Sequence, residues 1–158
     1  MSKQKGFTLI ELIVVIVILG IIAAIALPRF MNATDDAHRA AVKGTGGALA
    51  AGVALVHAQW ELNRAKGDTT PDTDVTGFGG GTVDTNTSGW PLGTAGALDC
   101  DGLWTALLQG SAPEIGADYT SAAAGGVCTY SYTLDGRTAG QRTIVYNSAT
   151  GVVTTNAN

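Results

Sequence analysis

The sequence predicts an α+β protein: a long N-terminal helix, apolar in its first half and amphipathic in its second, packed on a small antiparallel β-sheet head. An apolar run with helical continuation fills residues 7–66, and short alternating segments separated by turn residues fill the last third of the chain. Two cysteines, Cys100 and Cys128, follow the helix, and an even count in an exported region predicts one disulfide.

The composition limits the classes of function. A length of 158 residues allows one domain in addition to the apolar segment. The formal net charge is -4, and no stripe of clustered lysine and arginine is present, so nucleic acid is not expected as a partner. A cysteine pair that forms a disulfide is typical of an oxidising compartment.

Residues 7–27 form an apolar segment that contains a single charge, Glu11. Its length suffices for a helix to cross a bilayer. A lone carboxylate at membrane depth costs about 3 kcal/mol, so Glu11 is expected to meet a cationic partner. Lys3 and Lys5 precede the segment and predict that the rest of the chain lies outside the cytoplasm.

The helical pattern continues through residues 28–66. Small apolar residues recur there at spacings of three and four, which predicts a narrow stripe against which the sheet packs. These residues are Ala33, Ala37, Ala41, Gly44, Ala48, Ala51, Leu55, Ala58 and Leu62. Gly20 and Pro28 predict a kink, because both disfavour helix, and Gly67 is a suitable helix stop. An ordinary signal peptide, cut after Ala26, is a weaker alternative because the helix pattern runs on past that position.

The head begins at Gly67. Residues 67–99 are rich in Gly, Thr, Asp, Ser and Pro and predict a long connecting loop with short strands. Residues 101–109 predict a short helix with Asp99 or Asp101 as its N-cap. Three antiparallel strands are predicted at 127–134, 142–146 and 152–155. A Cys100–Cys128 bridge would stabilise this small head by about 3–4 kcal/mol.

The N-terminal motif carries a family resemblance. A short basic leader ending in Gly6, then Phe7, then FTLIE with its acid at Glu11, then an apolar run to Pro28, resembles type IV prepilins and type II secretion pseudopilins. The resemblance implies cleavage between Gly6 and Phe7 by a membrane prepilin peptidase and N-methylation of Phe7. It also implies that the stretch from Gly20 to Pro28 loses helical order on assembly.

The expected division of the chain follows from this resemblance. Residues 1–6 are the cleaved leader, 7–27 the membrane-spanning and filament-core helix, 28–66 its amphipathic continuation, and 67–158 the glycine-rich loop and β-sheet head. Within the head, the motifs WPLG, DCD and CTYSY at 90–93, 99–101 and 128–132, together with ALPRF at 26–30, resemble the mannose-sensitive haemagglutinin branch of type IVa pilins.

The sequence offers no catalytic, cofactor-binding or metal-binding pattern. His38 and His57 are 19 residues apart, about 28 Å along a helix, and cannot share a metal within one subunit. No motif of a zinc site, metalloprotease or serine hydrolase is present, and the glycine run at 77–82 lacks the lysine of a phosphate-binding loop. Calcium binding by the loop aspartates remains a lesser alternative. We therefore expect a non-enzyme without a cofactor.

Glu11 has two candidate partners. Cleavage after Gly6 would create a cationic amine on Phe7, which could pair with Glu11 of the same chain, four residues away, or with that of a neighbouring subunit. The family resemblance favours the neighbour, where the pair would set subunit register.

The resemblance implies a structural subunit of a type IV pilus filament that serves adhesion, attachment or motility. The protein would first be an inner-membrane, single-pass prepilin with a periplasmic head and then part of an extracellular helical homopolymer. The implied partners are further copies of itself, the prepilin peptidase, and the assembly platform and ATPase. A type II secretion pseudopilin is the first alternative, and a single-span periplasmic binding module or enzyme the second.

Overall fold

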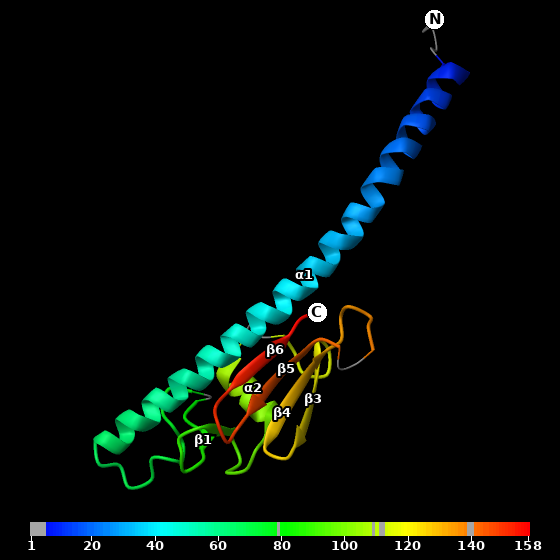
Figure 1. Cartoon of the computed structure of the whole chain (residues 1–158). Coiled ribbons are helices and arrows are strands. Elements are labelled where there is room, and N and C mark those ends of the chain that lie inside the picture. Colours follow the sequence, from blue (N-terminus) through cyan, green and yellow to red (C-terminus); the bar gives the residue numbers. More distant parts are fainter. Residues whose placement is uncertain (1–5, 79, 109, 111–112, 139–140) are drawn as a thin grey trace, which may run out of the picture. The chain divides into compact units, whose positions relative to one another are not determined.

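The computed structural model describes residues 6–78, 80–108, 110, 113–138 and 141–158. The leader lysines Lys3 and Lys5 lie outside this range. In chain order the elements are α1 (Leu9–Ala65), β1 (Asp84–Thr85), β2 (Pro91–Gly93), α2 (Cys100–Leu108), β3 (Tyr119–Ala124), β4 (Val127–Tyr132), β5 (Thr143–Asn147) and β6 (Val153–Asn156) (Figure 1). The chain separates into two compact units, Met1–Ala37 and His38–Asn158. The α+β prediction is confirmed.

Helix α1 is assigned without interruption through Gly20 and Pro28. It ends as the glycine at position 67 predicts. Gly67 has a φ of 83°, its N–H donates to the Arg64 carbonyl at 3.0 Å, and the Asp68 N–H donates to the Asn63 carbonyl at 3.1 Å. This pair of bonds is the Schellman motif, in which a left-handed residue satisfies the last free carbonyls of a helix.

The predicted packing face of α1 is wrong. All nine small residues of the predicted stripe, from Ala33 to Leu62, are exposed. The buried face lies about 100° around the helix and repeats with the same spacings of three and four. Its residues are Val42, Gly46, Leu49, Gly52, Val53, Val56 and Trp60. The face with the larger side chains is buried because these side chains remove more apolar area from water than alanine can.

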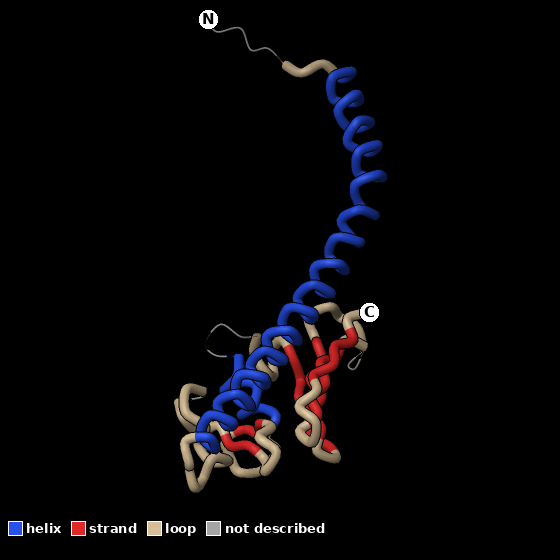
Figure 2. The backbone as a smooth tube through the Cα atoms, turned by 60° about the vertical axis from the view of Figure 1, so that its left-hand side comes forward, coloured by secondary structure: helices blue, strands red, loops and turns tan. Residues whose placement is uncertain are grey.

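Two glycines on this buried face allow close packing. A Cβ atom at Gly46 would overlap the side chain of Thr155 in β6, and one at Gly52 would lie 3.1 Å from the Cβ of Leu107 in α2. The helix therefore uses glycine where the sheet and α2 approach its backbone most closely. Figure 2 shows the strands gathered beside the second half of α1.

The sheet has the order β3-β4-β5-β6 with every neighbouring pair antiparallel. The strands predicted at 127–134, 142–146 and 152–155 are present, but β3 was not predicted. Half of its sequence, YTSAAA, is alanine, and it lacks the β-branched alternation that indicates a strand. It forms through its six-residue pairing with β4, across a two-residue turn at Gly125–Gly126 with φ of 57° and 79°.

The connecting loop and the short helix follow the predictions, except that positions 79 and 109 of the predicted ranges lie outside the described residues. β1 and β2 form a small separate pair within residues 67–99. Asp99, rather than Asp101, caps α2, because its Oδ1 accepts the Gly102 N–H at 3.1 Å and its carbonyl accepts the Leu103 N–H at 2.9 Å.

Candidate functional site

The N-terminal motif is exposed at the start of the described chain. Phe7 has 93% of its surface accessible, and α1 begins two residues later at Leu9. The bond between Gly6 and Phe7, the predicted cleavage point, therefore lies outside the helix. An extended, accessible backbone is the form in which a protease can bind a chain.

Thr8 and Glu11 form a capping box at the start of α1. A carboxylate oxygen of Glu11 accepts the Thr8 N–H at 2.8 Å and the Thr8 hydroxyl at 2.7 Å, and the Glu11 N–H donates to the Thr8 hydroxyl at 3.4 Å. These bonds satisfy N–H groups that the first helical turn would otherwise leave free. The carboxylate is thereby held one turn from the backbone nitrogen of Phe7.

The apolar part of α1 is exposed in the described residues. From Phe7 to Ala24 every residue is exposed, including a run of large aliphatic side chains. Its most apolar 18-residue window has a mean hydropathy of 3.2 and is 0% buried, so by length and composition this helix can cross a membrane. A surface of this kind is stable only in lipid or against other protein.

A second apolar surface lies on α1 within the head unit. The exposed residues of the predicted stripe form a helix face of small side chains with two leucines. This face, the outward face, consists of Ala41, Gly44, Ala48, Ala51, Leu55, Ala58 and Leu62. Gly44 has no atom within 4 Å of where a Cβ would lie, so nothing within the chain requires glycine there.

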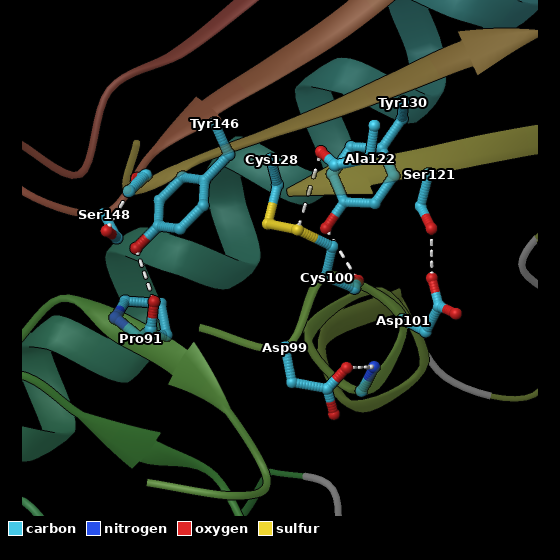
Figure 3. Close-up of a disulfide and its surroundings, with 12 residues drawn as sticks. Pro91, Asp99, Cys100, Asp101, Ser121, Ala122, Cys128, Tyr130, Tyr146 and Ser148 are labelled. Carbon is cyan, nitrogen blue, oxygen red and sulfur yellow. Dashed lines mark hydrogen bonds between the residues drawn. A yellow bond between two sulfur atoms is a disulfide. The ribbon is translucent and has the colours of Figure 1, made fainter. Parts of the chain in front are cut away.

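The disulfide fastens α2 to the sheet, as predicted. Cys100 opens α2, Cys128 lies in β4, and their Cα atoms are 5.6 Å apart with both residues buried. The Tyr130 hydroxyl donates to the Cys100 carbonyl at 2.8 Å, and the Ser121 hydroxyl donates to Asp101 (Figure 3). The bridge is therefore supported by hydrogen bonds from two adjacent strands.

Three buried tyrosines are neutral in the head, and two of them, Tyr130 and Tyr146, donate hydrogen bonds to backbone carbonyls. The Tyr146 hydroxyl donates to the Pro91 carbonyl at 2.7 Å, which joins β5 to β2 (Figure 3). Burial raises the pKa of Tyr119 to about 12, an effect that the nearby Thr45 hydroxyl partly opposes. Burial also raises the pKa values of Tyr130 and Tyr146. All three phenols stay protonated at physiological pH.

A stack of aromatic rings pins the connecting loop to the end of α1. The His57 ring lies between Trp60 and Trp90, with centroid separations of 5.6 and 4.0 Å. His57 Nδ1 is 3.2 Å from the Gly89 carbonyl oxygen, so this nitrogen carries the proton, and Trp60 Nε1 donates to Asp72 at 2.5 Å. These contacts give His57 a structural role.

The C-terminus is held by a buried ion pair. Arg142, with 1% of its surface accessible, pairs through Nη1 with Asp135 at 2.9 Å and donates through Nε to the Ala157 carbonyl at 3.3 Å.

The other histidine, His38, is hydrogen-bonded to the Tyr132 hydroxyl at 2.9 Å. Among the described residues no three His, Cys, Asp or Glu side chains converge as metal ligands.

Sequence reasoning missed Thr8. The signal was present, since Thr8-x-x-Glu11 before an apolar run is the signature of a capping box. The acid was instead interpreted through its charge alone. The remaining predicted site residues, Gly6, Phe7, Glu11, Gly20 and Pro28, all lie in the Met1–Ala37 unit, whereas Cys100 and Cys128 lie in the head unit.

Comparison with known proteins identifies the N-terminal motif and the head. Residues 1–27 match the family model of the prokaryotic N-terminal methylation motif. Fimbrial protein Q of Moraxella bovis is 34% identical over 145 aligned positions, which cover 71% of this chain and 90% of that protein. This similarity extends well beyond the apolar helix.

Other relatives match over a smaller share of their length. The type IV narrow pilus major component PilA5 of Thermus thermophilus is 51% identical over 57 residues, and the match covers 36% of this chain and 49% of that protein. The type II secretion system core protein G of Pseudomonas aeruginosa is 51% identical over 49 residues, 31% of this chain and 34% of that protein. No solved structure matches the chain. The motif, the long exposed helix, the disulfide-bonded head and the extended match to a fimbrial protein together mean that the chain belongs to the type IV pilin family.

Proposed function

We propose that this pilin is the structural subunit of a type IV pilus filament, made as a membrane-anchored prepilin, cleaved after Gly6, N-methylated on Phe7 and polymerised through its N-terminal helix. The observation that carries the proposal is the apolar helix with every residue from Phe7 to Ala24 exposed, preceded by an accessible Gly6–Phe7 bond. The apolar helix of such a chain needs to be covered by the membrane before assembly and by neighbouring subunits after it.

The same helix serves both environments. Before assembly, residues 7–27 span the inner membrane, with the leader in the cytoplasm and the head in the periplasm; the two leader lysines and the disulfide support this orientation. After assembly, the helix is covered by the helices of neighbouring subunits. Prepilin peptidase, an assembly platform and an ATPase are the partners that this route requires.

The outward face of α1 supports polymerisation through the helix. It presents residues such as Ala48, Ala51 and Leu55 to solvent, in a stripe without charge. Small side chains let a second helix approach closely, and removal of the leucines from water adds a hydrophobic contribution. We infer that in the filament a helix of another subunit covers this face.

Glu11 is proposed to set the axial register between subunits. Once the leader is removed, the Phe7 amine is a cation at nearly the same depth as the Glu11 carboxylate. Within one chain, Glu11 already accepts two hydrogen bonds from Thr8, which point the carboxylate toward the helix start. A neighbour's amine can therefore approach a carboxylate that is fixed in position, and the charge-assisted bond between them is strong in a medium of low dielectric constant.

A type II secretion pseudopilin is the alternative that one comparison favours. The P. aeruginosa relative named as a type II secretion protein is 51% identical, but only over 49 residues. The match that covers 90% of a relative is to a fimbrial protein, which supports the pilus over the secretion system.

Mass spectrometry of sheared surface material tests the proposal. The expected product begins at methylated Phe7 and comes from filaments that are lost when the coding sequence is deleted. An intact Met1, or an N-terminus created after Ala26, would contradict the prepilin route. Unchanged filaments in the deletion strain, combined with loss of a secreted substrate, would favour the pseudopilin.

Glu11 variants test the register role separately. Glu11→Ala is expected to insert into the membrane and to be cleaved normally but to lose most of its filament yield. Glu11→Gln keeps the size and the ability to accept hydrogen bonds without the charge, so it distinguishes charge pairing from capping. Filament formation by Glu11→Gln at the wild-type level would remove the ion pair from the mechanism.

A further inference from the structure

The strand β3 leaves one edge of the sheet open. Figure 1 shows β3 and β6 at opposite sides of the four-stranded sheet. β3 pairs with β4 in a continuous register from Tyr119 opposite Tyr132 to Ala124 opposite Val127. No bulge interrupts it. Among the described residues, the other side of β3 makes one isolated bridge, between Tyr119 and Ile115. Beyond Tyr119, this side pairs with no strand of the described chain.

The pairing with β4 determines which backbone groups point outward. The Thr133 N–H donates to the Asp118 carbonyl at 3.0 Å, so these two residues face each other as a hydrogen-bonded pair. In an antiparallel pair the two kinds of position alternate along the strand. The even-numbered residues of β3 therefore bond to β4, and the odd-numbered residues direct their N–H and C=O groups to the open side.

Two residues on this side have backbone groups without a partner in the described part of the chain. Tyr119, the first outward residue, is already satisfied, since its N–H donates to Glu114 at 3.2 Å and its carbonyl accepts from Gly116 at 2.7 Å. No backbone hydrogen bond reaches the outward groups of Ser121 and Ala123. They leave two donors and two acceptors, evenly spaced, at the edge of the sheet.

The edge lacks the features that usually block strand pairing. Residues 119–124 contain no charged residue and no proline. Ala122, Ala123 and Ala124 are exposed, and their methyl groups present little steric obstacle. Natural proteins commonly protect open edges with lysine, proline or a bulge, because an open edge is a template for another strand.

We propose that this edge pairs with the β3 edge of a second copy of the chain, antiparallel about a two-fold axis at Ala122. Ser121 of each copy then lies opposite Ala123 of the other, and all four outward groups on each strand find a partner. The charges favour this direction. Antiparallel pairing sets Asp118 opposite the uncharged Gly126, whereas parallel pairing in register would set Asp118 against Asp118.

A single pairing of this size is weak, but repetition strengthens it. In a filament every subunit carries the same edge, so two filaments could form many such contacts at once, and the combined affinity would far exceed that of one contact. This step rests on the proposed filament function. The two-fold axis makes the contact one between filaments rather than along one, since it joins identical surfaces and closes after two copies.

Engineered cysteines test the pairing directly on the full-length protein in detergent. Residues 122 of the two copies would face each other as a non-hydrogen-bonded pair with Cα atoms about 4.5 Å apart, within disulfide range. Ala122→Cys is expected to form a dimer under mild oxidation, with a 122–122 bridge in the peptide map. Ala124→Cys is the matched control, because it faces Thr120 of the other copy. Equal cross-linking of both variants, or none with Ala122→Cys, overturns the proposal.

Charge at the edge tests the same pairing in filaments. Ala122→Lys places two lysines opposite each other at the axis, whereas Thr129→Lys puts the same charge on the same sheet face one strand further in. Ala122→Lys is expected to reduce bundles collected by low-speed sedimentation several-fold, with Thr129→Lys at the wild-type level. Bundles that persist in Ala122→Lys overturn the pairing and leave the proposed function intact. A strain without any filaments would contradict the proposed function, and the detergent experiment would still decide the pairing.

Discussion

At the scale of single residues, Glu11 has a local role that precedes any contact between subunits. Its carboxylate closes the first turn of α1 through Thr8, so a residue that looks misplaced in an apolar segment is satisfied as soon as the helix forms. Capping and the proposed register role then involve the same carboxylate. Thr8 is the residue through which the two roles can be separated.

Thr8→Ala is expected to lower filament yield several-fold while leaving cleavage after Gly6 intact. The change removes the cap oxygen and the hydroxyl that donates to Glu11, a loss of about 1 kcal/mol for a typical N-cap. Thr8→Ser keeps both groups and should assemble like the wild type. Sheared filaments measured against total processed pilin give the result. A wild-type yield from Thr8→Ala would show that assembly does not depend on the cap.

The tyrosines predict the response of the head to alkali. The pKa of Tyr119 is raised to about 12, and those of Tyr130, Tyr132 and Tyr146 are also raised, in each case mainly by burial. A pKa above the unfolded value of about 10 means that the stabilisation is full below pH 10 and is lost as the pH rises from there toward 12.

Ultraviolet titration checks this expectation. The folded protein should show less phenolate absorbance near pH 10 than the denatured protein, and absorbance should rise at higher pH together with unfolding. The denatured, reduced protein is the control and should titrate near 10. A tyrosine of the folded protein that ionises at its ordinary pKa would contradict the buried arrangement.

At the scale of elements, the disulfide is the contact that makes α2 part of the head. It closes a loop with a sequence separation of 28 residues, and in the chain-entropy model such a bridge contributes about 3–4 kcal/mol. The double variant Cys100→Ala, Cys128→Ala should therefore unfold at a temperature about 10 °C lower or more. Thermal unfolding monitored by circular dichroism, with and without reductant, provides the measurement.

The effect of reductant on the wild type and on the double variant provides the control. Reductant should lower the unfolding temperature of the wild type and leave that of the double variant unchanged. Equal unfolding temperatures for the two proteins under oxidising conditions would mean that packing around Trp104 and Tyr130, rather than the bridge, holds α2 in place.

The features that depend on residues close together in the sequence could be predicted from the sequence. The helix stop at Gly67 and the cap of α2 depend on residues within one turn. The sequence identified the stop and narrowed the cap to Asp99 or Asp101. The bridge followed because two cysteines allow a single pairing. The strand β3 could not be predicted, because Ala122 and its alanine neighbours become a strand only when β4 lies beside them.

The orientation of α1 shows a second limit. Two apolar faces with the same period lie side by side on the helix, one containing Ala48 and Ala51, the other Leu49 and Val53. The periodicity of apolar residues detects both faces but does not show which of them packs on the sheet. That depends on how much apolar area each face can bury against the sheet. The face that was wrongly predicted to pack on the sheet is exposed in the structure. It is therefore the surface whose apolar character still needs an explanation.

At the scale of the whole molecule, α1 carries more apolar surface than one chain can cover. Every residue from Phe7 to Ala24 is exposed, and the outward face adds a stripe from Ala41 to Leu62. Glycine on an exposed helix face costs about 1 kcal/mol relative to alanine, yet Gly44 and Gly47 have no close neighbour within the chain. Their cost is explained if another helix approaches there in the filament.

Ala51→Lys is therefore expected to fold and be processed normally but to lose most of its filament yield. Lysine is a good helix former and Ala51 is exposed, so the head should keep its unfolding temperature. A buried, unpaired ammonium would prevent a second helix from docking, because its desolvation is not compensated. Ala51→Ser, which stays small and uncharged, should assemble. Filaments at the wild-type level from Ala51→Lys would mean that the outward face stays in solvent and that residues 7–27 alone hold the subunits together.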